Sequence, residues 1–345
     1  MYENIAFFIT FVVCKIKLMK KILFLVCLVT VVMLFAACTT LRTITYDRLQ
    51  AADINYPEQV RKVGVVNFMP VHDADAEQAD RLPFMREGDG KLVTDKLAQQ
   101  IAATHYFEEV VVCDSVFQQD GKWANGEVPQ GLVDSLGKEL GVDVLFAMEH
   151  VYIQFKEGTL FAPALMATVP AVDAVITPLL TIYLPGREKP LFTVSKSDSI
   201  AWEMTPMLSY EQVMKDASEY AATIPMSYLL PYWKTMERVY FDGGNVDMRD
   251  AGVYVRESNW EDASLLWRKV YDQKKGKAKM RAAFNLAVYS EVQDDYEQAS
   301  TYLDEALSLT EEGSWERALI LHYQVMLQEQ AHKNNLLKIQ MKRFE

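Results

Sequence analysis

The stretch FNLAVYSEVQDDYEQASTYLDEALSL, Phe284 to Leu309, decides the fold of the C-terminal part of the chain. Small and apolar residues lie on both sides of the polar run QDD, which predicts two helices joined by a short turn. The stretch AGVYVRESNWEDASLLWRKVY, residues 251–271, aligns on it with Ala263 opposite Ala299, a spacing of 36 residues. The helical hairpin is therefore expected to repeat, with residues 314–330 as a third first helix or a cap.

This repeat resembles the tetratricopeptide repeat, a helix pair that recurs near every 34 residues. The residues that match its first-helix NLG, its turn tyrosine and its small packing positions are Asn285, Leu286, Ala287, Tyr296, Ala299 and Ala306. The first unit matches less closely, because Trp267 and Val270 stand where Phe and Ala are usual. We therefore expect residues 241–345 to form an all-α, tetratricopeptide-like domain.

The resemblance implies an inner groove, lined by the first helices, that binds a protein partner. The residues expected to face that partner are Tyr254, Arg281, Asn285 and Val288. Gly252 and Phe284 occupy two places where repeats that clamp a terminal carboxylate have basic or amide groups. We expect the partner to be an extended or helical segment held mainly by apolar contacts. The bulky Trp260 and Trp267 are expected to pack outward, against the capping helix or against residues 228–240.

The preceding part alternates short β-branched runs with amphipathic segments. Residues 62–68, 109–113 and 142–155 are predicted to be buried strands, with helices over residues 90–107 and 129–141 between them. The helices are predicted from the stripes Val93, Leu97 and Ile101, and Leu132, Leu136 and Leu140, the second ending at Gly141. Strands and helices in this order with short connections imply parallel pairing.

Two further extended runs, residues 172–184 and 191–202, flank the turn Pro185-Gly186 and predict an antiparallel hairpin added to the sheet. Residues 58–240 are therefore expected to form one α/β (or α+β) domain with a mixed sheet. Ser209 and Gln212 form a capping box that opens a helix, and Pro225 and Pro231 should kink or break it. The aromatic residues of the segment 228–240 have helical spacing and are expected to be core at a domain interface, with a surface that stacks on carbohydrate as the alternative.

The N-terminal segment has the pattern of a secretory leader. An uncharged apolar run, residues 22–37, follows Lys20 and Lys21 and ends in two alanines before Cys38. This run is shorter than the ~20 residues that a membrane-spanning helix needs. It resembles a bacterial lipobox, with Phe35 where Leu is commoner, and the resemblance implies that Cys38 is acylated. More than one acyl chain makes such an anchor stable.

An uncleaved signal anchor, with Cys38 an ordinary interfacial residue, is the alternative. Residues 1–18 hold a second apolar run, so we expect the true start to be Met19. If residues 1–18 are translated, the uncleaved signal anchor is favoured more strongly. Residues 38–57 are polar and without sustained periodicity, and are expected to be a lipidated tether. Because residues 39–43 contain no acid, we expect an outer-membrane protein that faces the periplasm.

Composition excludes some functions. Without residues 1–37 the chain has 31 basic and 46 acidic residues, a net charge of −15, which argues against nucleic-acid binding. Cys113 is then the only cysteine besides Cys38, so no intramolecular disulfide is available. Three valines precede Cys113, and we expect a buried, unreactive thiol at a strand end.

No motif indicates catalysis, a metal or a cofactor. His150 lacks a second histidine four residues from Glu149, so it is expected to be a hydrogen-bonded structural residue. The run EGDGKLVT, residues 87–94, lacks the first glycine and the hydroxyl of a phosphate loop. Residues 72–80 are acidic, but they lack the glycine and final glutamate of a calcium loop. We expect no enzymatic activity.

The α/β part resembles small domains of periplasmic assembly lipoproteins, which bind proteins and have no active site. Lipobox, α/β domain and repeats together resemble a family of uncharacterised lipoproteins from Bacteroidota. The resemblance implies a lipid-anchored, non-catalytic envelope protein that acts as a scaffold or assembly factor through protein partners. The alternative is a glycan-binding lipoprotein partnered with an outer-membrane transporter, although such proteins are usually longer and helical throughout.

Overall fold

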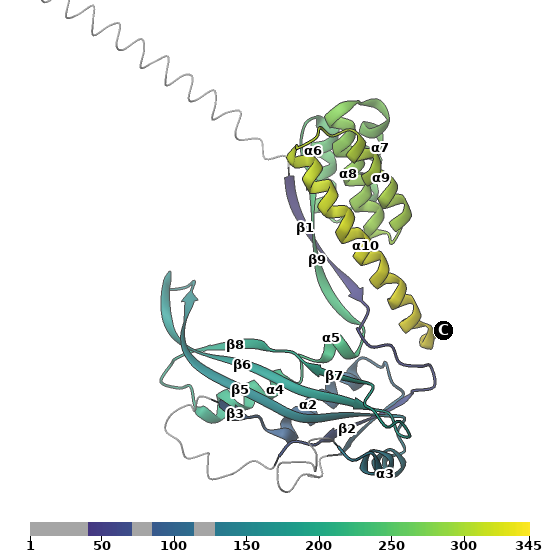
Figure 1. Ribbon diagram of the computed structural model, residues 1–345. Coiled ribbons are helices and arrows are strands. Elements are labelled where there is room, and N and C mark those ends of the chain that lie inside the picture. Colours follow the sequence, from purple (N-terminus) through teal and green to yellow (C-terminus); the bar gives the residue numbers. More distant parts are fainter. Residues whose placement is uncertain (1–40, 71–84, 114–127) are drawn as a thin grey trace, which may run out of the picture. The chain divides into compact units, whose positions relative to one another are not determined.

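The computed structural model describes residues 41–70, 85–113 and 128–345, which form two compact units. The α/β unit comprises residues 49–234 and 335–345, and the helical unit comprises residues 41–48 and 235–334 (Figure 1). A mixed sheet with helices is followed by consecutive helices, as the fold class expected from the sequence requires. Cys38 and the acidic loop 72–80 lie outside the described residues.

The first three predicted strands are confirmed and pair in parallel. β2 (Lys62–Asn67) lies between β4 (Glu109–Cys113) and β5 (Val144–Ala162). The connecting helices are α2 (Gly90–Ala103) and α3 (Gln130–Leu140). The predicted stop at Gly141 is also confirmed, because this residue adopts the left-handed conformation with φ of 65°.

The rest of the sheet is antiparallel. β5 continues into a long hairpin with β6 (Ala167–Tyr183), and the predicted run 191–202 forms two strands, β7 (Phe192–Ser195) and β8 (Asp198–Glu203), which both pair with β6. A short strand, β3 (Met85–Glu87), pairs with β5. The main strand order is β4-β2-β5-β6-β7.

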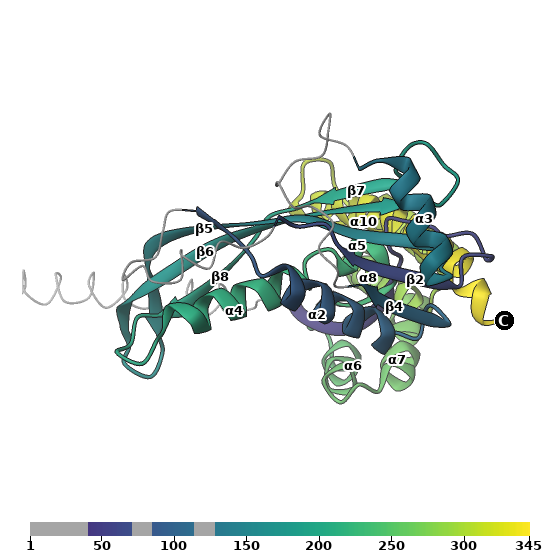
Figure 2. The same ribbon diagram turned by 90° about the horizontal axis from the view of Figure 1, so that it is seen from below.

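Alternate residues of the buried strands face different helices. Val63 and Val65 of β2 belong to a core with α2 and α4 (Tyr210–Ala221), while Val66 packs with α3 on the other face (Figure 2). The predicted stripe of α2 is buried in full, whereas α3 buries Val133 and Leu136 and leaves the other two predicted leucines half-buried. Ser209 begins α4, since its hydroxyl accepts a hydrogen bond from the Gln212 N–H at 3.1 Å.

The helical unit contains the two predicted hairpins and a long last helix. Its helices are α6 (Val246–Arg256), α7 (Trp260–Gln273), α8 (Gly276–Val292), α9 (Tyr296–Ser308) and α10 (Trp315–Met341), and the part of α10 from residue 335 onward belongs to the α/β unit. They share one core, in which Ala263, Ala299 and Ala306 are fully buried at the expected close approaches. The described residues contain no helix with the length and apolarity needed to cross a bilayer.

Two segments differ from their predictions, because each is a strand. β1 (Leu41–Gln50) occupies most of the expected tether, and β9 (Tyr232–Phe241) follows the single turn α5 (Met226–Leu229) where aromatic spacing suggested helix. The two strands pair with each other. Pro231 ends the helical segment, as predicted, and β-branched and aromatic residues follow it.

Two side chains also differ from their predictions. Cys113 is half-buried, because β4 is the edge strand of its sheet. Trp267 does not point outward but is fully buried, with its ring centroid 6.4 Å from that of Tyr240. That contact lies within the predicted segment 228–240, and Trp260 packs on Trp267 at 6.5 Å.

Candidate functional site

The expected partner-binding surface of the repeats is occupied by the chain's own strand β9. Tyr240 and Phe241 of β9 are buried in the same apolar core as Phe284 of α8 and Tyr323 of α10. The rings of Phe241 and Phe284 meet edge to face, with centroids 5.3 Å apart. A strand of this protein therefore lies where a bound peptide was expected.

Asn285 holds this strand by its backbone. Its side-chain oxygen accepts a hydrogen bond from the Phe241 N–H at 2.8 Å, and its side-chain nitrogen donates one to the Phe241 carbonyl at 2.8 Å. Asn285 is completely buried, so the two bonds satisfy backbone groups that have no access to water. The amide of Asn285 is therefore hydrogen-bonded to the chain itself rather than to a partner.

The other predicted groove residues are placed accordingly. Val288 is completely buried and Tyr254 is half-buried against the same core, so neither presents an open binding surface. The guanidinium carbon of Arg281 lies 5.4 Å from the centroid of the Phe241 ring. The structure thus brings Arg281 and Asn285 together at Phe241, and the prediction that all four side chains face a partner was wrong.

A buried ionic group fixes the middle of β9. Arg238 forms two hydrogen bonds with Glu291 of α8, at 2.8 Å and 2.5 Å, and the Tyr323 hydroxyl donates to the same carboxylate. The Glu291 side chain is fully buried and that of Arg238 is 6 % exposed. Because both charges are paired and hydrogen-bonded, the arrangement is a structural clamp without a free acid or base.

Arg48 attaches β1 to the turn between α8 and α9. Its guanidinium donates to the Glu291 carbonyl at 2.6 Å, to the Asp294 carboxylate at 2.5 Å and to the Tyr296 hydroxyl at 2.9 Å. The turn tyrosine of the repeat motif is therefore used to hold a strand that comes from before the α/β unit in the sequence.

Burial and the Glu291 charge act on the tyrosines around this clamp. Burial, followed by the charge of Glu291, raises the pKa of Tyr46 to about 12. The same two causes, in the same order, raise the pKa of Tyr323 well above its ordinary value of 10. Both tyrosines therefore stay neutral over the physiological pH range.

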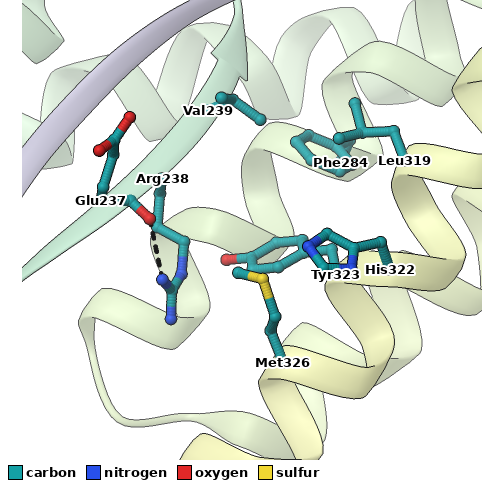
Figure 3. Close-up of a pocket in the computed structure, with 8 residues that line it drawn as sticks. All are labelled: Glu237, Arg238, Val239, Phe284, Leu319, His322, Tyr323 and Met326. Carbon is teal, nitrogen blue, oxygen red and sulfur yellow. Dashed lines mark hydrogen bonds between the residues drawn. The ribbon is translucent and has the colours of Figure 1, made fainter.

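A pocket of about 220 Å³ remains open between β9 and α10 (Figure 3). Its walls are mostly apolar and come from Val239, Phe284, Leu319, Tyr323 and Met326, with Glu237, Arg238 and His322 completing them. Since an apolar cavity of roughly 150 Å³ can hold a benzene molecule, the pocket has room for one large apolar side chain. We call it the β9–α10 pocket.

The polar groups at the β9–α10 pocket do not form a reactive set. Arg238 is engaged by Glu291 and by the Glu237 carbonyl at 2.9 Å, and the Tyr323 hydroxyl is bound to Glu291. Over residues 41–70, 85–113 and 128–345, no group of three or more His, Cys, Asp or Glu side chains is arranged to hold a metal. The geometry suits apolar recognition.

His150 of the α/β unit is a hydrogen-bonded residue, as predicted. Its Nδ1 lies 3.3 Å from a carboxylate oxygen of Glu87, and its ring stacks on Tyr152 with centroids 5.0 Å apart. The hydrogen bond that His150 donates to Glu87 raises the pKa of His150. The other Glu87 oxygen accepts from the Val151 N–H at 2.6 Å, so the carboxylate ties β3 to β5.

Sequence reasoning missed the strand in the groove, although a signal was present. Six of the ten residues 232–241 are aromatic or β-branched, a composition that favours a strand. The period of two in burial could not be read from polarity, because the charged Arg238 is buried and the apolar Val239 is only half-buried. Aromatic spacing drew attention to the helical interpretation instead. β1 carried no comparable signal, because its residues are mainly polar and half-exposed.

These features define a class: an α/β unit with a mixed sheet, combined with consecutive helical hairpins that hold a β ribbon of the same chain. The chain belongs to the family described as Domain of unknown function (DUF8603), which matches residues 60–241. Residues 249–329 match a second family, Domain of unknown function (DUF6340). No curated protein matches the chain.

Proposed function

We propose that this chain is a lipid-anchored, non-catalytic protein of a bacterial cell envelope that acts as a scaffold or assembly factor by binding protein partners. The leader pattern before Cys38 and the absence of acid in residues 39–43 support an anchor on the outer membrane, facing the periplasm. The β9–α10 pocket supports partner binding, and it is the observation that carries the proposal.

The pocket replaces the groove as the expected contact. Because β9 fills the groove, a partner that leaves the fold intact contacts the helical unit beside β9, where Val239, Leu319 and Met326 remain only partly covered. Burying one Leu, Met or Phe side chain in such a pocket is worth roughly 1.5–3 kcal/mol. That contribution suits one anchor residue within a larger interface.

Site-specific photo-crosslinking in cells tests the proposal. A photoreactive residue at His322, on the rim of the pocket, should crosslink to a discrete protein, and Met326→Glu should abolish that product. The control position is Val325, which lies on the same helix, is 65 % exposed and is outside the pocket. Identical crosslinking from both positions, or persistence with Met326→Glu, would contradict partner binding at the pocket.

The glycan-binding alternative is favoured by one observation. Among the four aromatic residues of the segment 228–240, Trp233 is 72 % exposed, which suits stacking on a sugar ring. Binding on a glycan array that Trp233→Ala abolishes would support this alternative, and an array without signal would leave the protein scaffold as the better proposal.

A further inference from the structure

A second pocket in the helical unit, of about 240 Å³, lies where β9 ends and α6 begins. Gly243, Gly244 and Asn245 form one part of its wall. Lys277 and Arg281, one turn apart on α8, contribute two cationic side chains. We call this cavity the glycine-loop pocket; Met248 and Ala278 complete its wall, and its two charged side chains are both cationic.

Arg281 has no carboxylate partner among the described residues. By contrast, the arginines of the same unit that pair with carboxylates are Arg42, Arg48, Arg238 and Arg256. Stacking on Phe241 holds the Arg281 guanidinium in place, and its Nε is buried without a hydrogen-bond acceptor. A guanidinium that is positioned in a cavity but lacks an anion is suited to bind one.

The backbone at the glycine-loop pocket also favours an anion. The loop leads into α6, and Lys277 and Ala278 lie in the first turn of α8. α8 has neither a side-chain cap nor an acidic residue in its first turn. Its leading N–H groups therefore lack a side-chain acceptor, and the positive end of the helix dipole adds to the charge of the two cations.

The charges around the loop sum to a positive value. Asp242, next to the loop, is shared by Arg42 and Arg256, and Lys277 lies 3.2 Å from Glu316. With Arg281, and with Asp247 of the first turn of α6 and its partner Lys269, five cations face three carboxylates, an excess of two positive charges in a chain whose net charge is −12. The site therefore attracts anions although the protein as a whole repels them.

The glycine-loop pocket lies beside the start of β1. Arg42, which pairs with Asp242, is the second residue of β1, and only two residues separate Cys38 from Leu41. The three Cα–Cα steps from Cys38 to Leu41 span at most about 11 Å. Trp315, with its ring centroid 6.0 Å from that of Phe241, is 51 % exposed at the same end. Tryptophan and basic side chains together are typical of a surface at lipid headgroups.

We infer that the glycine-loop pocket binds the phosphate group of an anionic phospholipid, in the membrane to which the chain is attached. The inference rests on the proposed lipid anchor, because acyl chains on Cys38 would hold the pocket at the bilayer surface. Phosphate oxygens accept hydrogen bonds from the Arg281 guanidinium, from Lys277 and from the backbone of the loop and of α8.

Vesicle binding by the chain from Thr39, which has no acyl group and contains every described residue, tests this inference. We expect it to sediment with phosphatidylglycerol vesicles and not with phosphatidylcholine vesicles. Arg281→Gln should weaken binding at least about tenfold, the effect of losing one charge-assisted hydrogen bond. Arg249→Gln is the matched control, since Arg249 is an exposed arginine of α6 that does not line the pocket.

A second variant separates binding from folding. Ala278→Glu places a carboxylate in the pocket and an acid in the first turn of α8, so it should abolish vesicle binding without lowering the melting temperature. Binding of inorganic phosphate without binding of vesicles would overturn the lipid as ligand. Vesicle binding that neither variant reduces, or no binding of either probe, would overturn the site. Because the chain tested has no acyl group, each of these outcomes leaves the proposed anchor standing.

Discussion

The side-chain amide of Asn285 forms two hydrogen bonds with the backbone of Phe241, one to its N–H and one to its carbonyl, both of 2.8 Å. Phe241 belongs to β9, which enters the helical unit directly from the α/β unit along the chain. The strand is an intramolecular ligand of the repeats.

Loss of the Asn285 amide should destabilise the protein strongly. Asn285→Ala leaves the N–H and the carbonyl of Phe241 buried without partners, so we expect the free energy of unfolding to fall by about 2–4 kcal/mol. Urea denaturation measures it. The control is Asn335→Ala, at an exposed helical position, which should change stability by less than about 0.5 kcal/mol. A loss no larger than that of the control would show that β9 is not held by this pair.

The negative charge of Glu291 should contribute more to the free energy of unfolding than the shape of its side chain. Glu291→Gln leaves the Arg238 guanidinium buried without a counter-ion, and we expect a loss of about 3–5 kcal/mol in the free energy of unfolding. Replacing both partners, as Arg238→Met with Glu291→Met, removes this buried pair together and should recover much of that loss. Arg48, whose guanidinium also lies 3.9 Å from Glu291, keeps Asp294 as its partner in the double variant. If the double variant is no more stable than Glu291→Gln, the ion pair stabilises the folded protein by more than the free energy needed to remove its two charges from water.

Stability should decline at high pH because of Tyr46. Its pKa is about 12 in the folded protein against an ordinary value of 10. Between these values the unfolded chain binds fewer protons than the folded one, so the free energy of unfolding falls as pH rises from about 10 to about 12 and is unaffected by this group below 10. Denaturation at several pH values should show a shallower decline for Tyr46→Phe. Parallel curves would contradict the assignment.

The last turn of α10 should stabilise the α/β unit. The Gln340 amide donates to the carbonyls of Ala52 and Ile54, at 2.9 Å and 3.0 Å, and accepts from the Ala52 N–H at 3.0 Å. We expect Gln340→Ala to cost about 2–3 kcal/mol in unfolding free energy. Gln328→Ala, an exposed position of the same helix, is the control. Equal melting temperatures for the two variants would refute the role of Gln340.

Acylation at Cys38 remains a prediction from the sequence. Cys38→Ala should prevent incorporation of a labelled fatty-acid analogue and leave the leader uncleaved, because the thiol is the acceptor of the lipid. Label on the Cys38→Ala protein would exclude this cysteine as the site. Protease treatment of intact cells tests the orientation, and rapid digestion of the ectodomain would contradict a periplasmic location.

Local patterns account for most of the secondary structure. The stripe Val93, Leu97 and Ile101 and the β-branched run of β2 specify a helix and a buried strand, since their periods of 3.6 and 2 arise within a few neighbouring residues. The alanines 263, 299 and 306 likewise indicated where helices approach closely, because only small side chains fit there. For these helices and strands the local order of residues along the chain was sufficient to predict the secondary structure.

What faces the repeats could not be read in the same way. Asn285 has the same identity whether its amide binds a partner or Phe241, and Val288 is equally apolar on an open or a covered surface. What covers the repeats is determined by β1 and β9. The hydrogen bond between Thr235 of β9 and Asp47 of β1 joins residues 188 positions apart. Pairing over that distance leaves no local pattern, because each strand's ladder bonds are satisfied by backbone groups that every sequence possesses. The sequence by itself therefore determined the helical hairpins and the mixed sheet, while only the tertiary structure decided that the groove is filled from within.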